Sequence, residues 1–242
     1  MNINNHTYYQ LLGVALLSFL IMSCTKISTN VKVKHSGALR NIMSGNIEAT
    51  ISLDTLSQKE HFYALGAVAD LKGEIQIFDS QPHNSVVIDN NISITDSYAM
   101  KAALLVYAEV ETWNGFNIEN VKTKVDLEKR IFETAKSNGI NVQEPFPFLL
   151  EGEVSSLDWH VINWKDGDTD HNHDKHKQSG LNGSLDNSAV EIIGFYSTKH
   201  KAVFTHHSTN IHMHFKTEDN KLSGHVDDLI LNKKMSLKLP KR

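Results

Sequence analysis

The residues best suited to chemistry lie near the end of the chain, in the segment 210–231. His212 and His214 alternate there with three apolar residues. Alternate side chains of a β-strand point to the same face. We therefore expect both imidazoles on one face of a strand and the apolar side chains on the other. The polar run 217–221 predicts a turn, and the apolar residues after it predict a returning strand.

A symmetric turn in this hairpin would bring a third imidazole to the same patch. It places His214 opposite His225 and His212 opposite Asp227, and cross-strand partners lie about 5 Å apart. Three neutral imidazoles with an open fourth position are typical of a catalytic zinc site. Asp227 is then suited to orient one of the ligands. The alternative is a His-rich surface hairpin that binds no metal.

Composition limits the class of protein. The chain has 242 residues, a formal net charge of −4 and 40% hydrophobic residues. These values suit one sizeable globular domain, or two small ones that share a core. The mildly acidic net charge gives no indication of the basic surface with which proteins bind nucleic acid. Fourteen His residues are compositional support for metal binding.

The single cysteine, Cys24, follows an apolar run at residues 11–22 that is short for a membrane span. This pattern predicts a signal peptide over residues 1–23. The sequence Ile-Met-Ser-Cys at its end resembles a bacterial lipoprotein cleavage box. We therefore expect lipid attachment at Cys24, a tether over residues 24–34 and a place in the bacterial cell envelope. Residues 1–10 depart from this pattern because they contain no Lys or Arg. The alternative is a buried Cys that ends an ordinary signal or anchor helix.

Periodicity predicts the elements that position the hairpin. The apolar run 102–110 predicts a central strand. Residues 67–79 predict two strands joined at Lys72-Gly73. The pattern over 126–138 predicts a helix capped by Asp126 and ended by Gly139. A second helix is expected from Asp54 or Thr55 to Phe62.

The long polar stretch 165–183 contains three further imidazoles, on His171, His173 and His176. They are candidates for a second metal site. No apolar flank would hold them rigid, however, so the stretch also reads as a solvated, mobile loop.

Several of these segments together resemble a known family. The C-terminal half of the bacterial α-acetolactate decarboxylases is similar to the segments 194–198, 210–219 and 224–227. Upstream, Leu71-Lys72-Gly73-Glu74-Ile75 resembles the strand–turn–strand of that family, and Pro145-Phe146-Pro147 resembles its Pro-aromatic-Pro segment.

The resemblance implies an α+β domain over residues 35–242, with mixed and antiparallel sheets, a few helices and a metal site on the C-terminal β-hairpin. It implies Zn²⁺ on His212, His214 and His225. It also implies that Glu74 donates a proton, whereas by itself Glu74 reads as an exposed turn residue. The implied substrate is a small 2-hydroxy-3-keto acid such as 2-acetolactate, converted to acetoin. A homodimer is one of the oligomeric states that the sequence allows.

Two departures from the family qualify this interpretation. The family places an Arg that positions the substrate carboxylate just before the Pro-aromatic-Pro segment, but residues 138–144 contain none. After the signal region the only Arg residues are Arg40, Arg130 and Arg242. The family also has a late Glu, and no Glu follows His225 here. A non-catalytic zinc-binding envelope lipoprotein on the same fold is therefore the alternative function.

Overall fold

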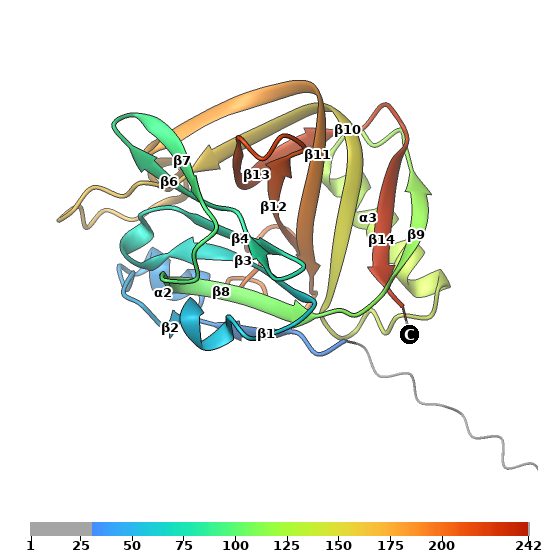
Figure 1. Ribbon diagram of the computed structural model, residues 1–242. Coiled ribbons are helices and arrows are strands. Elements are labelled where there is room, and N and C mark those ends of the chain that lie inside the picture. The colour runs from blue at the N-terminus through green and yellow to red at the C-terminus, as the bar shows by residue number, and fades with distance from the viewer. Residues whose placement is uncertain (1–30, 242) are drawn as a thin grey trace, which may run out of the picture.

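The structure, a computed structural model, describes residues 31–241 and folds them into two β-sheets with a few helices (Figure 1). The predicted signal peptide and Cys24 lie outside the described residues. All pairings between the named strands are antiparallel. The predicted α+β class, with antiparallel sheets and few helices, is therefore confirmed.

The first sheet is built around a central strand. Its order is β1-β8-β3-β4-β6-β7, with β2 on β8 and β5 on β4. As predicted, the apolar run forms a central strand, because it is buried on both faces and has neighbours on both sides. The strands are β1 Lys34–Ser36, β2 Ile51–Ser52, β3 Phe62–Val68, β4 Glu74–Phe78, β5 Gln81–Pro82, β6 Asn84–Ile88, β7 Asn91–Thr95 and β8 Lys101–Glu109.

The second sheet curls into a ring. Two long strands, β10 and β11, pair along their whole length, β12 and β13 follow β11 in the sheet order, and β13 returns to pair with β10. Strands β14 and β9 extend the sheet beyond β10 (Figure 1). The strands are β9 Trp113–Ile118, β10 Phe146–Val161, β11 Leu181–Tyr196, β12 Ile211–Thr217, β13 Ser223–Ile230 and β14 Met235–Pro240.

The described residues contain three α-helices, each of which follows a strand of one sheet and precedes another strand of the same sheet: α2 Leu39–Met43, α3 Lys124–Ser137 and α4 His173–Gln178. The predicted helix over 126–138 is α3, but it starts earlier, because Thr123 rather than Asp126 is its cap and accepts a hydrogen bond from the backbone N–H of Asp126. The prediction of a helix from Asp54 or Thr55 to Phe62 is wrong. Only a 3₁₀ turn forms over Leu53–Leu56, and Phe62 already begins β3.

The two sheets pack against each other over one apolar cluster. It joins β3 and β8 of the first sheet to Ile193 and Phe195 of β11. A buried hydrogen bond also crosses the sheets, from Gln76 Nε2 to Ser223 Oγ at 2.8 Å. This packing places β4 beside the C-terminal hairpin, which decides the composition of the site described below. In the described part of the chain no helix is long and apolar enough to cross a bilayer.

Gly66, in the middle of β3, marks a very close approach of two strands. A Cβ atom there would lie 2.0 Å from the Leu104 carbonyl oxygen and 2.9 Å from Leu105 Cα, which are backbone atoms of β8. Gly66→Ala is therefore expected to lower the free energy of unfolding by about 1–3 kcal/mol or more, as overpacked sites do. Denaturant unfolding would measure it. Gly115→Ala on β9 is the control, since its nearest contact would be Ser236 Oγ at 3.6 Å. Equal stability of the two variants would contradict the prediction.

Candidate metal centre

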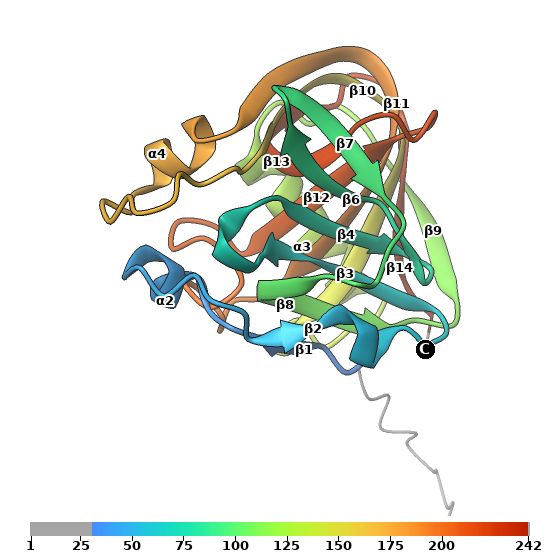
Figure 2. The ribbon, with the colours of Figure 1, turned by 60° about the vertical axis from the view of Figure 1, so that its left-hand side comes forward.

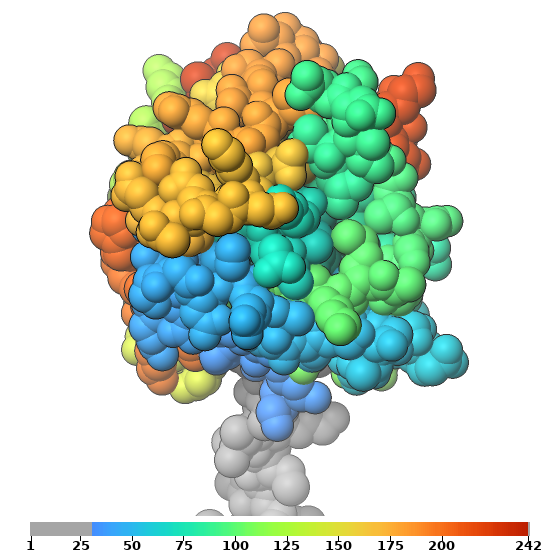
Figure 3. All heavy atoms as spheres, turned by 90° about the vertical axis from the view of Figure 1, so that its left-hand side faces the viewer, coloured from blue at the N-terminus to red at the C-terminus, as the bar shows by residue number. Residues whose placement is uncertain are grey.

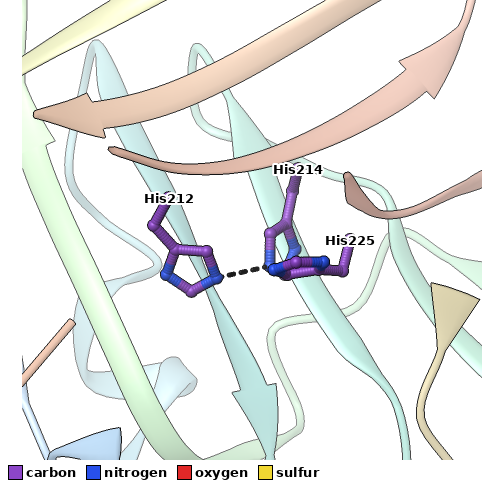
Figure 4. Close-up of side chains that lie close together, drawn as sticks. All are labelled: His212, His214 and His225. Carbon is purple, nitrogen blue, oxygen red and sulfur yellow. Dashed lines mark hydrogen bonds between the residues drawn. The ribbon is translucent and has the colours of Figure 1, made fainter. Parts of the chain in front are cut away.

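Three imidazoles converge on one point between the sheets (Figure 4). His214 pairs with His225 across the β12–β13 ladder, so this part of the predicted register is confirmed. The three ring centroids form a nearly equilateral triangle with sides of 5.1, 5.1 and 5.2 Å. The Nε2 atoms of His212 and His214 lie 3.3 Å apart.

The other predicted pair, His212 with Asp227, is absent from the β12–β13 ladder, which runs only from His214 to Lys216 on the β12 side. His212 pairs with Phe195 on β11 instead. The β10–β13 pairing passes from Asp228 to Val226 and skips Asp227, so Asp227 is the extra residue of a β-bulge. Bulges re-aim side chains.

The hydrogen bonds of His212 and His214 determine which ring nitrogen carries the proton. His212 Nδ1 lies 2.8 Å from the Phe204 carbonyl oxygen, and His214 Nδ1 lies 3.1 Å from Gln76 Oε1. Gln76 Nε2 donates to the carbonyl oxygen of His83, so Oε1 is the atom that faces His214. Both oxygens can only accept, so both Nδ1 atoms donate. In neutral rings each Nε2 then carries a lone pair, and the two lone pairs face each other.

The three rings are held neutral. Burial is the largest cause that lowers the pKa of His212 and of His214 far below the usual range, and burial lowers the pKa of His225 to about 3. Two facing lone pairs repel each other unless a cation lies between them. A tetrahedral Zn²⁺ with Zn–N bonds of about 2.0–2.1 Å spaces its ligand nitrogens by about 3.3–3.4 Å. The ligand atoms of His212, His214 and His225 all lie within 4.8 Å of one another, so the set fits such an ion.

Asp227 and His160 flank the three imidazoles. Asp227 Oδ1 lies 3.0 Å from His160 Nδ1 and 3.5 Å from His225 Nδ1, and Lys177 Nζ lies 3.1 Å from Oδ2. Burial by itself would raise the pKa of Asp227, but the contacts with His160 and His225 hold it well below its usual range. A carboxylate in this position orients the imidazole beside it.

His160 has no sequence motif around it that indicates a role in this site. Only the pairing of β10 with β13 places it opposite His225, and no local pattern predicts that pairing. With His225 and Asp227, His160 forms a second group in the described chain whose donor atoms could hold a metal ion.

Glu74 reaches the site from the other sheet. It is the first residue of β4 and is 4% exposed, so it is not an exposed turn residue. Its Oε1 accepts a hydrogen bond from the backbone N–H of Ile162 at 3.2 Å, and its Oε2 lies 3.8 Å from His214 Nε2. Burial raises the pKa of Glu74 to about 7, against an opposing effect of His160. A carboxyl group with this pKa can hold or release a proton near neutral pH.

The imidazoles and Glu74 line a cavity of about 710 Å³. Figure 2 shows α2 and α4 on the same side of the molecule, and Figure 3 shows their segments, in blue and orange, adjoining on the surface. Residues of both helices line the cavity, as do apolar side chains of the sheets and loops. The apolar lining residues include Leu39, Ile42, Leu71, Leu104 and Ile162.

The stretch 165–183 contains a short helix and a ring contact with Trp164, the residue that precedes the stretch. Residues 173–178 form α4, and the ring of His171 stacks on Trp164 with 4.5 Å between centroids. His171 Nδ1 lies 2.9 Å from His176 Nε2, whereas His173 packs against His206. The three imidazoles proposed for a second metal therefore do not converge on one point.

Gln76 connects the first sheet to one of the candidate metal ligands, because its Oε1 contacts His214 Nδ1. Gln76→Met removes the acceptor for His214 Nδ1 at similar side-chain length. Loss of such a partner weakens metal affinity by about 10–100-fold. Zinc titration against a chelator of known affinity would measure this, with the exposed Gln143→Met as control. An unchanged zinc affinity would show that the bond does not orient the ring.

Comparison with known proteins relates this architecture to one enzyme family. The family model "Alpha-acetolactate decarboxylase" matches residues 34–241. The α-acetolactate decarboxylase of Bacillus subtilis strain 168 has a similar structure, with a TM-score of 0.70 and 15% identity over 87% of this chain and 86% of that chain. A Staphylococcus aureus protein of unknown function, described as similar to α-acetolactate decarboxylase, has a TM-score of 0.67 and 13% identity over 85% of this chain and 84% of that chain.

At these identities the solved structures show the fold alone, and the comparison with curated proteins finds no match. The family model covers nearly all of the described chain. The sequence resemblance seen in the hairpin and in the Gly-Glu and Pro-aromatic-Pro segments is thereby confirmed. The chain belongs to the α-acetolactate decarboxylase family.

Proposed function

We propose that this protein is a zinc-dependent carbon–carbon lyase that removes carbon dioxide from a small 2-hydroxy-3-keto acid such as 2-acetolactate, giving acetoin. The observation that carries the proposal is the pair of buried, neutral imidazoles whose Nε2 lone pairs face each other at 3.3 Å. A third imidazole and the buried carboxyl of Glu74 stand beside them in one cavity. Membership of the decarboxylase family supports the reaction class.

The residues of the chain divide the reaction between them. A zinc ion on His212, His214 and His225 would supply a Lewis acid for the hydroxyl and ketone oxygens of the substrate and stabilise negative charge. When the carbon–carbon bond breaks, the electron pair stays on the substrate and carbon dioxide leaves. The carbon that lost the carboxylate must then gain a proton. Glu74 is placed to deliver it, and solvent restores the proton to Glu74.

Turnover tests the proposal directly. The purified, zinc-loaded protein is incubated with racemic 2-acetolactate and acetoin is measured, with the His212→Ala variant as control. We expect acetoin from the native protein only. No product above the level of the control would remove the decarboxylase function for this substrate.

A second function is favoured by one observation, the absence of an Arg in residues 138–144. A non-catalytic envelope lipoprotein that binds zinc on the same fold would not need a carboxylate-binding Arg. It would bind zinc on the same three imidazoles but produce no acetoin. Metal content is thus the same for both functions, and turnover separates them.

Cys24 and the apolar run before it support a place in the cell envelope, which we propose as the site of action. The prediction is that the protein made in a bacterial host sediments with membranes, and that Cys24→Ser shifts it to the soluble fraction, because a lipid chain can no longer be attached. Fractionation and immunoblotting would measure this. Equal distribution of the two proteins would contradict lipid anchoring at Cys24.

A further inference from the structure

Lys124 places a half-buried positive charge in the cavity. It is the first residue of α3, it lines the cavity together with the three imidazoles, and its Nζ donates to the backbone carbonyl oxygen of Asp227 at 3.3 Å. Between residues 31 and 241, no carboxylate lies within ion-pair distance of this ammonium group. A long bond to one carbonyl leaves most of its donor capacity unused, since an ammonium carries three N–H donors.

Such an arrangement is electrostatically unfavourable. Even the partial removal of a charge from water is unfavourable unless the charge is paired. The start of a helix is also the end that repels cations. Burial accordingly lowers the pKa of Lys124, while the surrounding Asp227, Asp228 and Glu128 act in the opposite direction. An anion bound in the cavity would pair with the ammonium group of Lys124 and so offset the cost of its partial removal from water.

The other two cations that line the cavity are in different situations. Lys177, on α4, is paired with Asp227 Oδ2 at 3.1 Å. Arg40, on α2, is exposed to solvent at the mouth of the cavity. Arg130 is exposed on α3 and is not among the residues that line the cavity. Of the three cations that line the cavity, Lys124 is therefore the one that is shielded in part from solvent and has no carboxylate within ion-pair distance in the described chain. It lines the same cavity as His212 and His225, and its Nζ contacts the backbone of Asp227, two residues after His225.

We propose that Lys124 binds the carboxylate group of the substrate. This inference rests on the proposed function, and it assigns to α3 the positive charge that residues 138–144 lack. An ammonium group is a point charge with rotatable donors, so it holds a carboxylate without the bidentate geometry of a guanidinium.

The role of this contact is binding rather than acceleration. The carboxylate is charged in the bound substrate and becomes neutral carbon dioxide as the reaction proceeds, so the attraction to Lys124 weakens toward the transition state. Interactions that are no stronger in the transition state do not raise kcat. Loss of Lys124 is therefore expected to raise KM with little loss of kcat.

Two stable probes that differ only in the carboxylate test the inference without turnover. The first is 2,3-dihydroxy-2-methylbutanoate, the reduced form of acetolactate, and the second is butane-2,3-diol. Calorimetric titration of the zinc-loaded protein is expected to show tighter binding of the acid. The Lys124→Gln substitution should lower the affinity for the acid by about 10–100-fold, the range for a charge-assisted hydrogen bond. The affinity for the diol should not change. Lys124→Arg should restore much of the affinity, and the exposed Lys122→Gln should match the native protein.

Each other result overturns the inference. If Lys124→Gln binds the acid as well as the native protein does, or if Arg40→Gln loses the acid in its place, Lys124 is not the carboxylate ligand. If Lys124→Gln weakens both probes equally and lowers the melting temperature, Lys124 has a structural role only. The proposed function fails separately: acid selectivity that depends on Lys124, without acetoin production by the native protein, would leave the anion site intact and remove the decarboxylase.

Discussion

Replacing His225 by alanine is expected to lower the zinc affinity of this protein by about two orders of magnitude or more and to reduce acetoin formation to background. A four-ligand zinc site contributes about 10–16 kcal/mol, so one ligand accounts for about 3 kcal/mol, or roughly a hundredfold. His225 is the best ligand to remove because its side chain is 21% exposed, whereas that of His214 is 1% exposed. Its loss leaves the Nδ1 bonds of His212 and His214 in place.

Zinc affinity by competition with a chelator, and thermal unfolding with and without zinc, would measure the effect. His173→Ala is the matched control. His173 also lines the cavity, but its side chain is 57% exposed and it belongs to neither candidate metal group of the described chain. If His225→Ala retains the zinc affinity of the control, the three imidazoles are not a metal site, and the decarboxylase proposal falls with them.

Replacing Glu74 by glutamine is expected to reduce kcat by about 10²–10⁴-fold, the range for loss of a positioned general acid. The amide keeps the shape of the side chain, and its oxygen can still accept the bond from the backbone N–H of Ile162. Zinc affinity should therefore change little. The variant loses only the capacity to release a proton to the substrate.

Steady-state kinetics and zinc titration on the same preparation would separate the two properties. Glu109→Gln is the control, because Glu109 also lies in the first sheet but is paired with Lys59 at the surface. Full activity of Glu74→Gln would assign the proton transfer to another group. Loss of zinc together with activity would show that Glu74 supports the metal ligands instead.

The position of Lys124 bears on the choice between the two proposed functions, the decarboxylase and the non-catalytic zinc-binding lipoprotein. Without the Arg of the family, a decarboxylase would lack a positive charge that binds the substrate carboxylate. This absence favoured the alternative function, a zinc-binding protein without activity. The half-buried ammonium of Lys124, on α3 in the same cavity, weakens that argument. The late Glu of the family has no counterpart after His225. Of the acids that line the cavity, Glu74 is the one whose pKa is raised, to about 7, whereas the pKa of Asp227 is lowered.

Local patterns in the sequence were sufficient for the hairpin and for several of its supporting elements. Alternation placed His212 and His214 on one face of β12, and the polar turn set the register that pairs His214 with His225. These features depend on neighbours a few residues apart, which is the range over which side-chain period and turn chemistry act. For the same reason the apolar stripe of α3 and the buried run of β8 were predicted correctly.

Only the tertiary structure decided what surrounds the three imidazoles. Glu74 and Gln76 come from the first sheet, His160 from β10 and Lys124 from α3, and no short-range pattern connects these segments to the hairpin. The curling of the second sheet and its packing on the first bring them together, and that packing is determined by apolar surfaces far apart in sequence. The sequence by itself thus determined a cluster of imidazoles. The burial that makes them neutral, and the acid and the cation beside them, depend on long-range contacts that local patterns do not encode.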